Sequence, residues 1–263
     1  MESRCFLLQL LALPTIVIFL FLFLVSACHT TDAGALLSFR SHITKDPSGA
    51  LSSWCAVSNG TTSNGFCRWA GVRCSHGGHV VSLNIRGLGL AGTISPLIGN
   101  LTSLRVLDLS DNKLEGEIPA SLGKCQELQS LNLSVNFLSG VIPPAIGQLT
   151  NLADLCIRHN NISGYVPSAF ANLTALTVIN VADNYLHGEI PSWLGNLTSL
   201  KSFNVAGNLM RGNIPDAVSK LTNLKLLIYQ QMDLEVMFLH HCLIYPPFRC
   251  CILGQTSFQV PCL

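Results

Sequence analysis

An asparagine recurs at a constant spacing of 24 residues through the middle of the chain, and no other feature restricts the possible folds as strongly. The positions are Asn112, Asn136, Asn160, Asn184 and Asn208. Aliphatic, glycine and proline positions recur at the same step around each asparagine. A period of this length is typical of a solenoid, in which every repeat is one supersecondary unit that buries its apolar face against its neighbours.

Two aliphatic positions precede each asparagine and lie two residues apart, as Leu107 and Leu109 do. Residues at that spacing point to one face of a β-strand, and the residue between them points to the other. We therefore expect one short strand in every repeat, and an α/β-type solenoid with parallel strands on its concave face. An asparagine amide gains nothing from burial unless it is hydrogen-bonded. The five asparagines are thus predicted to form a structural ladder that binds backbone groups of adjacent repeats.

The repeat unit resembles a known family. Residues 107–119 read LDLSDNKLEGEIP and resemble the plant extracellular leucine-rich repeat. Upstream, residues 66–74 read FCRWAGVRC and, together with Trp54, resemble the amino-terminal cap of plant leucine-rich-repeat receptor kinases. Within that family the chain looks most like the rice immune receptor kinases of the bacterial-blight-resistance type. The resemblance covers about residues 30–227. It implies a leucine-rich-repeat superhelix that recognises a peptide or protein outside the cell and then contacts a co-receptor kinase.

The amino-terminal segment and the cysteines indicate a secreted chain. Residues 6–25 are almost wholly apolar and lead to small residues ahead of Cys28, which predicts a signal peptide over residues 1–27. The alternative is an uncleaved membrane anchor, because the apolar run has about the 20 residues that span a bilayer. The 11 cysteines fit an oxidising compartment. Cys67 and Cys74 could form one tight bridge within a cap over residues 28–77.

The repeat pattern ends before the chain does. Six complete repeats and the start of a seventh occupy about residues 78–227. The register then predicts Asn, Gly and Pro, but the chain has Met232, Val236 and Leu239. Residues 228–263 are therefore expected to be a non-repeat tail. No kinase motif is present, so we interpret the chain as truncated before the transmembrane helix and kinase of the resembled family.

The outward-pointing strand residues are the candidates for ligand binding. The central column of this face is predicted to be exposed and comprises Asn84, Asp108, Asn132, Cys156, Asn180 and Asn204. From it and the two flanking columns we select Asp108, Ser130, Asp154, Arg158, Asn180 and Asn204. Solenoids of this type present extended concave binding surfaces. The alternative is that these are only solvated positions and that the true ligand site lies in repeats absent from this chain.

Catalysis, metals and cofactors are not expected. Ser134, His159 and Asp183 formally resemble a nucleophile, a base and an orienting acid, but nothing marks an oxyanion site. The histidines and cysteines at 240–242, 250 and 251 lack the paired short spacing of a structural zinc site. The net charge of +1 leaves no excess field to hold nucleic acid.

Two further cysteines have predicted states. Cys125 occupies a column otherwise filled by leucine, so it is predicted to be a buried hydrophobic residue. Cys55 replaces the asparagine that the family usually has after Trp54 and is predicted to be unpaired.

Six Asn-X-Ser/Thr sequons predict N-glycosylation. They lie at Asn59, Asn100, Asn132, Asn161, Asn172 and Asn196. Asn132 is the most informative, because a glycan there would stand on the concave face and block part of it.

These patterns predict an extracellular recognition module in the apoplast that binds a peptide or protein and has no catalytic function of its own. A second hypothesis is a secreted repeat protein that inhibits a microbial wall-degrading enzyme. A third is that the chain is a mis-predicted piece of a full receptor serine/threonine kinase, which would lie at the plasma membrane.

Overall fold

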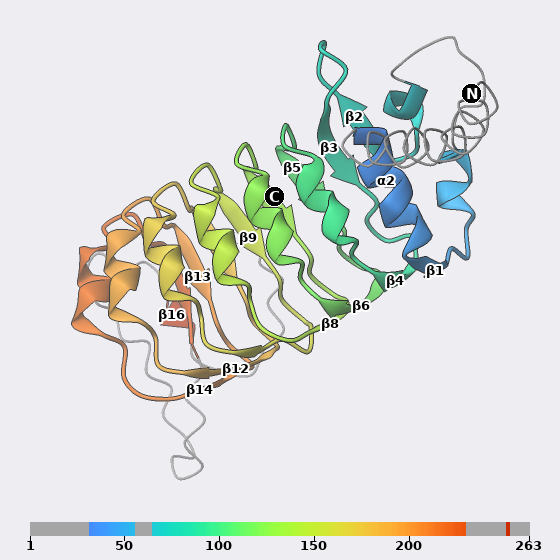
Figure 1. Cartoon of the computed structure of the whole chain (residues 1–263). Coiled ribbons are helices and arrows are strands. Elements are labelled where there is room, and N and C mark those ends of the chain that lie inside the picture. The colour runs from blue at the N-terminus through green and yellow to red at the C-terminus, as the bar shows by residue number, and fades with distance from the viewer. Residues whose placement is uncertain (1–31, 56–64, 230–250, 253–263) are drawn as a thin grey trace, which may run out of the picture.

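The computed structural model describes residues 32–55, 65–229 and 251–252, which form a curved solenoid (Figure 1). Its main sheet has the strand order β16-β15-β13-β11-β9-β7-β5-β3-β2. These strands are β2 (Val72–Cys74), β3 (Val80–Asn84), β5 (Val106–Asp108), β7 (Ser130–Asn132), β9 (Asp154–Cys156), β11 (Val178–Asn180), β13 (Ser202–Asn204), β15 (Leu226–Ile228) and β16 (Cys251–Ile252). From β3 to β15 all pairs are parallel and join residues 24 apart, such as Asp108 and Asn132. The predicted solenoid of parallel strands is confirmed.

The five repeating asparagines are buried and bond the backbone at both ends of the amide. Asn160 is representative. Its Nδ2 donates to the carbonyl oxygens of Leu133 (3.1 Å), Ile157 (3.0 Å) and Arg158 (3.3 Å). Its Oδ1 accepts from the N–H of Leu138, one repeat earlier, at 3.0 Å. Each asparagine therefore connects its own turn to the preceding repeat, because these partners belong to both.

A second sheet follows the asparagines, and here the prediction of one strand per repeat is wrong. Four strands pair in the order β1 (Ile43–Lys45), β4 (Ala91–Thr93), β6 (Lys113–Glu117) and β8 (Phe137–Ser139). Three more pair in the order β10 (Ser163–Gly164), β12 (Tyr185–Gly188) and β14 (Leu209–Met210). The ladder explains these strands, because each asparagine Oδ1 accepts an N–H such as that of Leu114 or Leu138 and holds the segment extended.

The two sheets differ in register. The second sheet joins residues 22 apart, as in Glu115 with Phe137 and Ser163 with Tyr185. Neighbours on this surface are therefore shifted by two residues from the columns of the 24-residue sequence repeat.

Short 3-10 helices form the side of the solenoid opposite the main sheet (Figure 1). They are η3 (Pro96–Asn100), η4 (Ala120–Lys124), η5 (Pro144–Gln148), η6 (Ser168–Asn172), η7 (Ser192–Asn196) and η8 (Asp216–Lys220). A proline is the N-cap residue of η4, η5, η6, η7 and η8. Its fixed φ and missing N–H end the strand pairing there.

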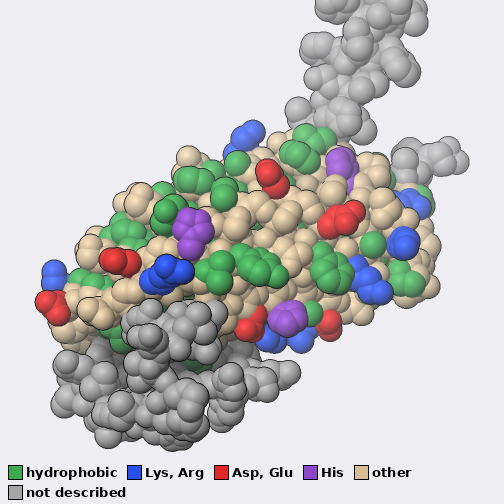
Figure 2. Space-filling view, turned by 90° about the horizontal axis from the view of Figure 1, so that it is seen from below, with side chains coloured by type: hydrophobic (Ala, Val, Ile, Leu, Met, Phe, Trp, Pro, Cys, Tyr) green, Lys and Arg blue, Asp and Glu red, His purple; other side chains and the backbone are tan. Residues whose placement is uncertain are grey.

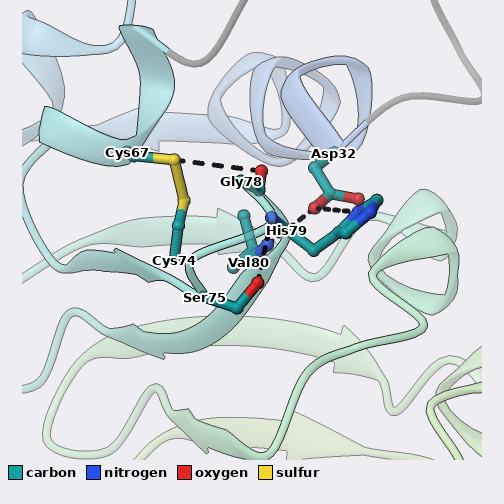
Figure 3. The surroundings of a disulfide bond; sticks show 7 residues. All are labelled: Asp32, Cys67, Cys74, Ser75, Gly78, His79 and Val80. Atoms are coloured by element: carbon teal, nitrogen blue, oxygen red, sulfur yellow. Dashed lines mark hydrogen bonds and ion pairs between the residues drawn. A yellow bond between two sulfur atoms is a disulfide. The ribbon is translucent and has the colours of Figure 1, made fainter.

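The amino-terminal cap consists of α2 (Asp32–Ser41), η1 (Ala50–Ser53), η2 (Gly65–Arg68) and the antiparallel strands β1 and β2. Trp54 is fully buried and stacks on Trp69 with ring centroids 5.7 Å apart. The predicted disulfide between Cys67 and Cys74 is present and fastens η2 to β2 (Figure 3). Asp32 accepts the N–H of Val80 at 2.7 Å. The cap thus covers the first edge of both sheets.

Candidate functional site

The candidate site is the inner face, by which we mean the outward side chains of the main sheet in the columns of residues 84–204, 82–202 and 86–206. Strand pairing brings the selected residues onto one surface. Ser130 and Asp154 are direct neighbours, and so are Asn180 and Asn204. Asp108 lies between Asn84 and Asn132 in the same column as Asn180 and Asn204, and Arg158 follows strand β9.

The first two positions of the central column are accessible. Asn84 is exposed and Asp108 is half-buried. Asp108 Oδ1 accepts from the N–H of Ser110 at 3.0 Å and from its hydroxyl at 2.6 Å. These bonds hold the carboxylate in one orientation while part of it faces solvent.

The prediction that the whole column is exposed is wrong. Asn132, Cys156, Asn180 and Asn204 are 9%, 1%, 1% and 6% exposed. The Oδ1 atoms of the three asparagines fold back to accept the N–H two residues on. Cys156 is disulfide-bonded.

Three buried polar atoms on this face have no hydrogen-bond partner among the described residues. They are Ser134 Oγ, Asn180 Nδ2 and Ser202 Oγ. The side-chain oxygen of Asn180 is bonded, so the unpaired group is the amide nitrogen, which carries two N–H donors. An unpaired buried donor costs roughly 1–3 kcal/mol, a cost that an added acceptor would remove.

Charged side chains lie beside the column. Asp154 is half-buried and accepts the Thr177 hydroxyl at 3.1 Å. Arg158 is half-buried, and its guanidinium makes no hydrogen bond or ion pair within the described residues. His159 and Asp183 are both exposed and lie 4.0 Å apart. This part of the inner face therefore offers both signs of charge.

Ser134 is buried and its hydroxyl is unbonded, so it does not join His159 and Asp183 in a catalytic arrangement. Within the described part of the chain, no three metal-ligating side chains come together. The histidine and cysteine group at 240–251 lies outside it, apart from the backbone of Cys251.

The cysteines of the described segments have defined states. Burial raises the pKa of the Cys125 thiol to about 11, so this thiol stays protonated and unreactive at neutral pH. Cys55 is free and exposed. Both cysteines have the states predicted from the sequence.

The sequons differ in accessibility. Asn161, Asn172 and Asn196 are exposed, Asn100 is half-buried, and Asn132 is buried with its Nδ2 donating to Ser110 Oγ at 3.3 Å. Asn59 and the predicted signal peptide lie outside the described residues. No described helix has the length and apolar character needed to cross a bilayer.

The fold and this face define a solenoid of the class that binds other molecules on a repeated surface. The family model described as "Leucine-rich repeat region" matches residues 79–241, and the model "Leucine rich repeat N-terminal domain" matches residues 29–75. The chain therefore belongs to the leucine-rich repeat family.

Plant receptor kinases are similar to it in sequence. An LRR receptor-like serine/threonine-protein kinase of Arabidopsis thaliana, EFR, is 44% identical over 84 residues, which are 31% of this chain and 8% of that protein. Receptor kinase-like protein Xa21 of Oryza sativa subsp. japonica is 43% identical over 86 residues, again 31% of this chain and 8% of the relative. The matches thus span about a tenth of these kinases. The expected likeness to plant receptor kinase ectodomains is confirmed.

Solved ectodomains share the fold. The PEPR1–AtPEP1 structure is similar with a TM-score of 0.71 and 33% identity, covering 74% of this chain and 27% of that one. The ectodomain of the Arabidopsis receptor kinase HAESA, in complex with an IDA peptide hormone, has a TM-score of 0.66 and 37% identity, covering 74% and 32%. A further HAESA structure contains both the IDA peptide and the co-receptor SERK1, with a TM-score of 0.64 and 32% identity over 76% and 37%.

Proposed function

We propose that this chain is an extracellular recognition module that binds a peptide or protein ligand on its inner face and contacts a co-receptor kinase. The observation that carries the proposal is the registered polar surface, in which Asp108, Ser130, Asp154 and Arg158 are all partly accessible. Its kinship with ectodomains solved together with a peptide hormone supports the same conclusion.

The proposed ligand segment is extended and carries charges of both signs. Arg158 would pair with a carboxylate of the ligand, and Asp108 and Asp154 with its amine or guanidinium groups. Asn180 is buried, so it would contribute to the shape of the face rather than a donor that the ligand reaches. Asn204 is buried, and its Oδ1 accepts a backbone N–H. It would therefore help to shape the binding surface but would not offer its oxygen to the ligand.

The proposal includes secretion. Removal of residues 1–27 as a signal peptide would place the chain in the apoplast, where the Cys67–Cys74 disulfide persists. The proposal concerns binding only and assigns no catalytic step to these residues.

The test is selection of ligands from a displayed library of random linear peptides, using the full chain secreted from plant cells. Enriched peptides are then measured against Arg158→Glu and against Lys124→Glu, the same change of charge at the carboxyl end of η4. We expect Arg158→Glu to weaken binding about tenfold or more and Lys124→Glu to leave it unchanged. Equal affinities for both variants would contradict an inner-face site.

A further inference from the structure

The second sheet carries a cluster of exposed apolar side chains. In the part of the chain that the structure describes, six large hydrophobic residues are exposed: Phe137, Val141, Tyr165, Tyr185, Leu209 and Ile214. Phe137, Tyr185 and Leu209 lie on β8, β12 and β14, and the other three follow strands of this sheet by one to four residues. Figure 2 views the molecule from this side and shows hydrophobic side chains gathered along it. Isolated exposed residues of this kind are common, but several large ones gathered on one surface are a reason to ask what covers them.

A sequon stands inside this cluster. Asn161 directly follows the ladder residue Asn160, and Phe137 and Tyr185 directly follow the ladder residues of the preceding and next repeats. The three side chains therefore occupy equivalent positions, and all are exposed. Backbone hydrogen bonds hold the three repeats side by side at these positions. Asn161 N–H donates to Leu138 O at 2.7 Å, and Tyr185 N–H donates to Ile162 O at 2.7 Å.

The aromatic rings near Asn161 are positioned by the sheet. Tyr165 packs edge-on against His187, with ring centroids 4.2 Å apart. It also lies over Gly188, where a Cβ atom would come within 2.6 Å of the Tyr165 ring. Val141 and Tyr185 both pair with Ser163, the third residue of the sequon. The strands on each side of the accessible Asn161 amide therefore present apolar side chains. Backbone pairing fixes the positions of these side chains.

We propose that Asn161 carries an N-linked glycan whose core sugars pack against Phe137 and Tyr185. The inference rests on the extracellular location in the proposed function, since glycan transfer requires the secretory pathway. The co-reactant is an oligosaccharide linked to a polyisoprenyl pyrophosphate. The Asn161 amide nitrogen bonds to the anomeric carbon of the first N-acetylglucosamine and loses a proton. The bond from that carbon to the phosphate oxygen breaks, and the pyrophosphate leaves with the electron pair.

The chemistry of the sugars fits this surface. The C–H face of a pyranose ring is apolar and matches the flat face of an aromatic ring, while its hydroxyl groups remain in water. A glycan attached between Phe137 and Tyr185 covers them without needing a second protein. It would also leave the inner face open, because Asn161 belongs to the second surface of the solenoid.

The other sequons provide internal controls. Asn172 and Asn196 are exposed at the ends of the 3-10 helices η6 and η7, on the opposite side of the repeats from the main sheet. Neither lies among the exposed apolar residues of the second sheet.

The experiment measures how readily each glycan is removed from the folded, full-length secreted chain. Protein is produced in plant cells with a mannosidase inhibitor, so that all sites carry oligomannose glycans, and is treated with endoglycosidase H. Glycopeptide mass spectrometry gives the rate at each site. We expect Asn161 to be hydrolysed about tenfold more slowly than Asn172 and Asn196, the factor that corresponds to about 1.4 kcal/mol of protection. After denaturation the three rates should be equal.

Two double variants test which side chains protect the Asn161 glycan from hydrolysis. Phe137→Ser with Tyr185→Ser should raise the rate at Asn161 to that of the control sites. Leu209→Ser with Ile214→Ser, on and beyond β14, should leave it slow. All four side chains are exposed, so folding should tolerate both changes, and the comparison of folded with denatured wild type needs no variant.

The outcomes separate this inference from the proposed function. Glycans at Asn172 and Asn196 with an empty Asn161, or with equal rates in the folded protein, would overturn the packed glycan alone. Secreted protein without any glycan would also refute it, but would leave ligand binding intact. Failure of the chain to enter the secretory pathway would overturn both.

Discussion

Two columns that contain asparagine run along the solenoid, four residues apart in each repeat. The ladder column is buried throughout, and the inner-face column is buried from Asn132 to Asn204. In the ladder column, Asn184 bonds through both ends of its amide, to three carbonyl oxygens and one N–H. In the inner-face column, Asn180 uses only its oxygen, and its Nδ2 has no partner among the residues that the structure describes. Burial alone therefore does not make an asparagine structural; the pairing of its donor with backbone carbonyls does.

The largest effect should come from removing one rung of the ladder. Asn160→Leu deletes four hydrogen bonds. The carbonyls of Leu133 and Ile157 keep bonds from Asn136 and Asn184, but the N–H of Leu138 loses its acceptor. We expect the free energy of unfolding to fall by about 3 kcal/mol, measured by urea denaturation. A loss below about 1 kcal/mol would remove the distinction between the columns.

A smaller effect of opposite sign is expected one residue before the ladder. Val135 has φ of 57°, and its equivalents in other repeats include Gly87 and Gly207. A β-branched residue is strained in this region, and glycine is not. Val135→Gly should raise the free energy of unfolding by about 1 kcal/mol, because the relief of strain exceeds the entropy that glycine loses. Thermal denaturation that shows a lower melting temperature would contradict this account.

The smallest effect is expected in the inner-face column. Asn180→Leu removes a buried amide whose donor is unpaired, so the change in stability should stay within about 1 kcal/mol in either direction. Asn84→Leu, at the exposed end of the same column, serves as the matched control. If Asn180→Leu lost as much stability as Asn160→Leu in parallel urea titrations, the unpaired donor would have an unrecognised partner.

Much of this structure could be predicted from the period of the sequence. The ladder residues, the main strands and the Cys67–Cys74 cap stand where their patterns place them, because each is a local consequence of repeat spacing. The second sheet was not predicted. Its strands have no alternating apolar pattern of their own, and they exist because a ladder Oδ1 accepts an N–H from the preceding repeat.

The candidate site was predictable only in part. The column of residues 84–204 could be assigned to one face from the sequence. The burial of Asn180 could not be predicted, because the 24-residue repeat predicts the same exposure for every member of a column. The apolar surface on which Asn161 stands was also hidden. It follows from a second surface whose strands were not expected.

Sequence alone determined that this chain is a stack of repeats, since a fixed period of aliphatic residues, asparagine and glycine can bury itself only by stacking. The tertiary structure decided which polar groups on that stack face water and which second surface the stack creates. Both properties depend on the register in which neighbouring repeats pair. Paired residues are 24 apart in the main sheet and 22 apart in the second sheet, and the sequence of a single repeat does not contain that register.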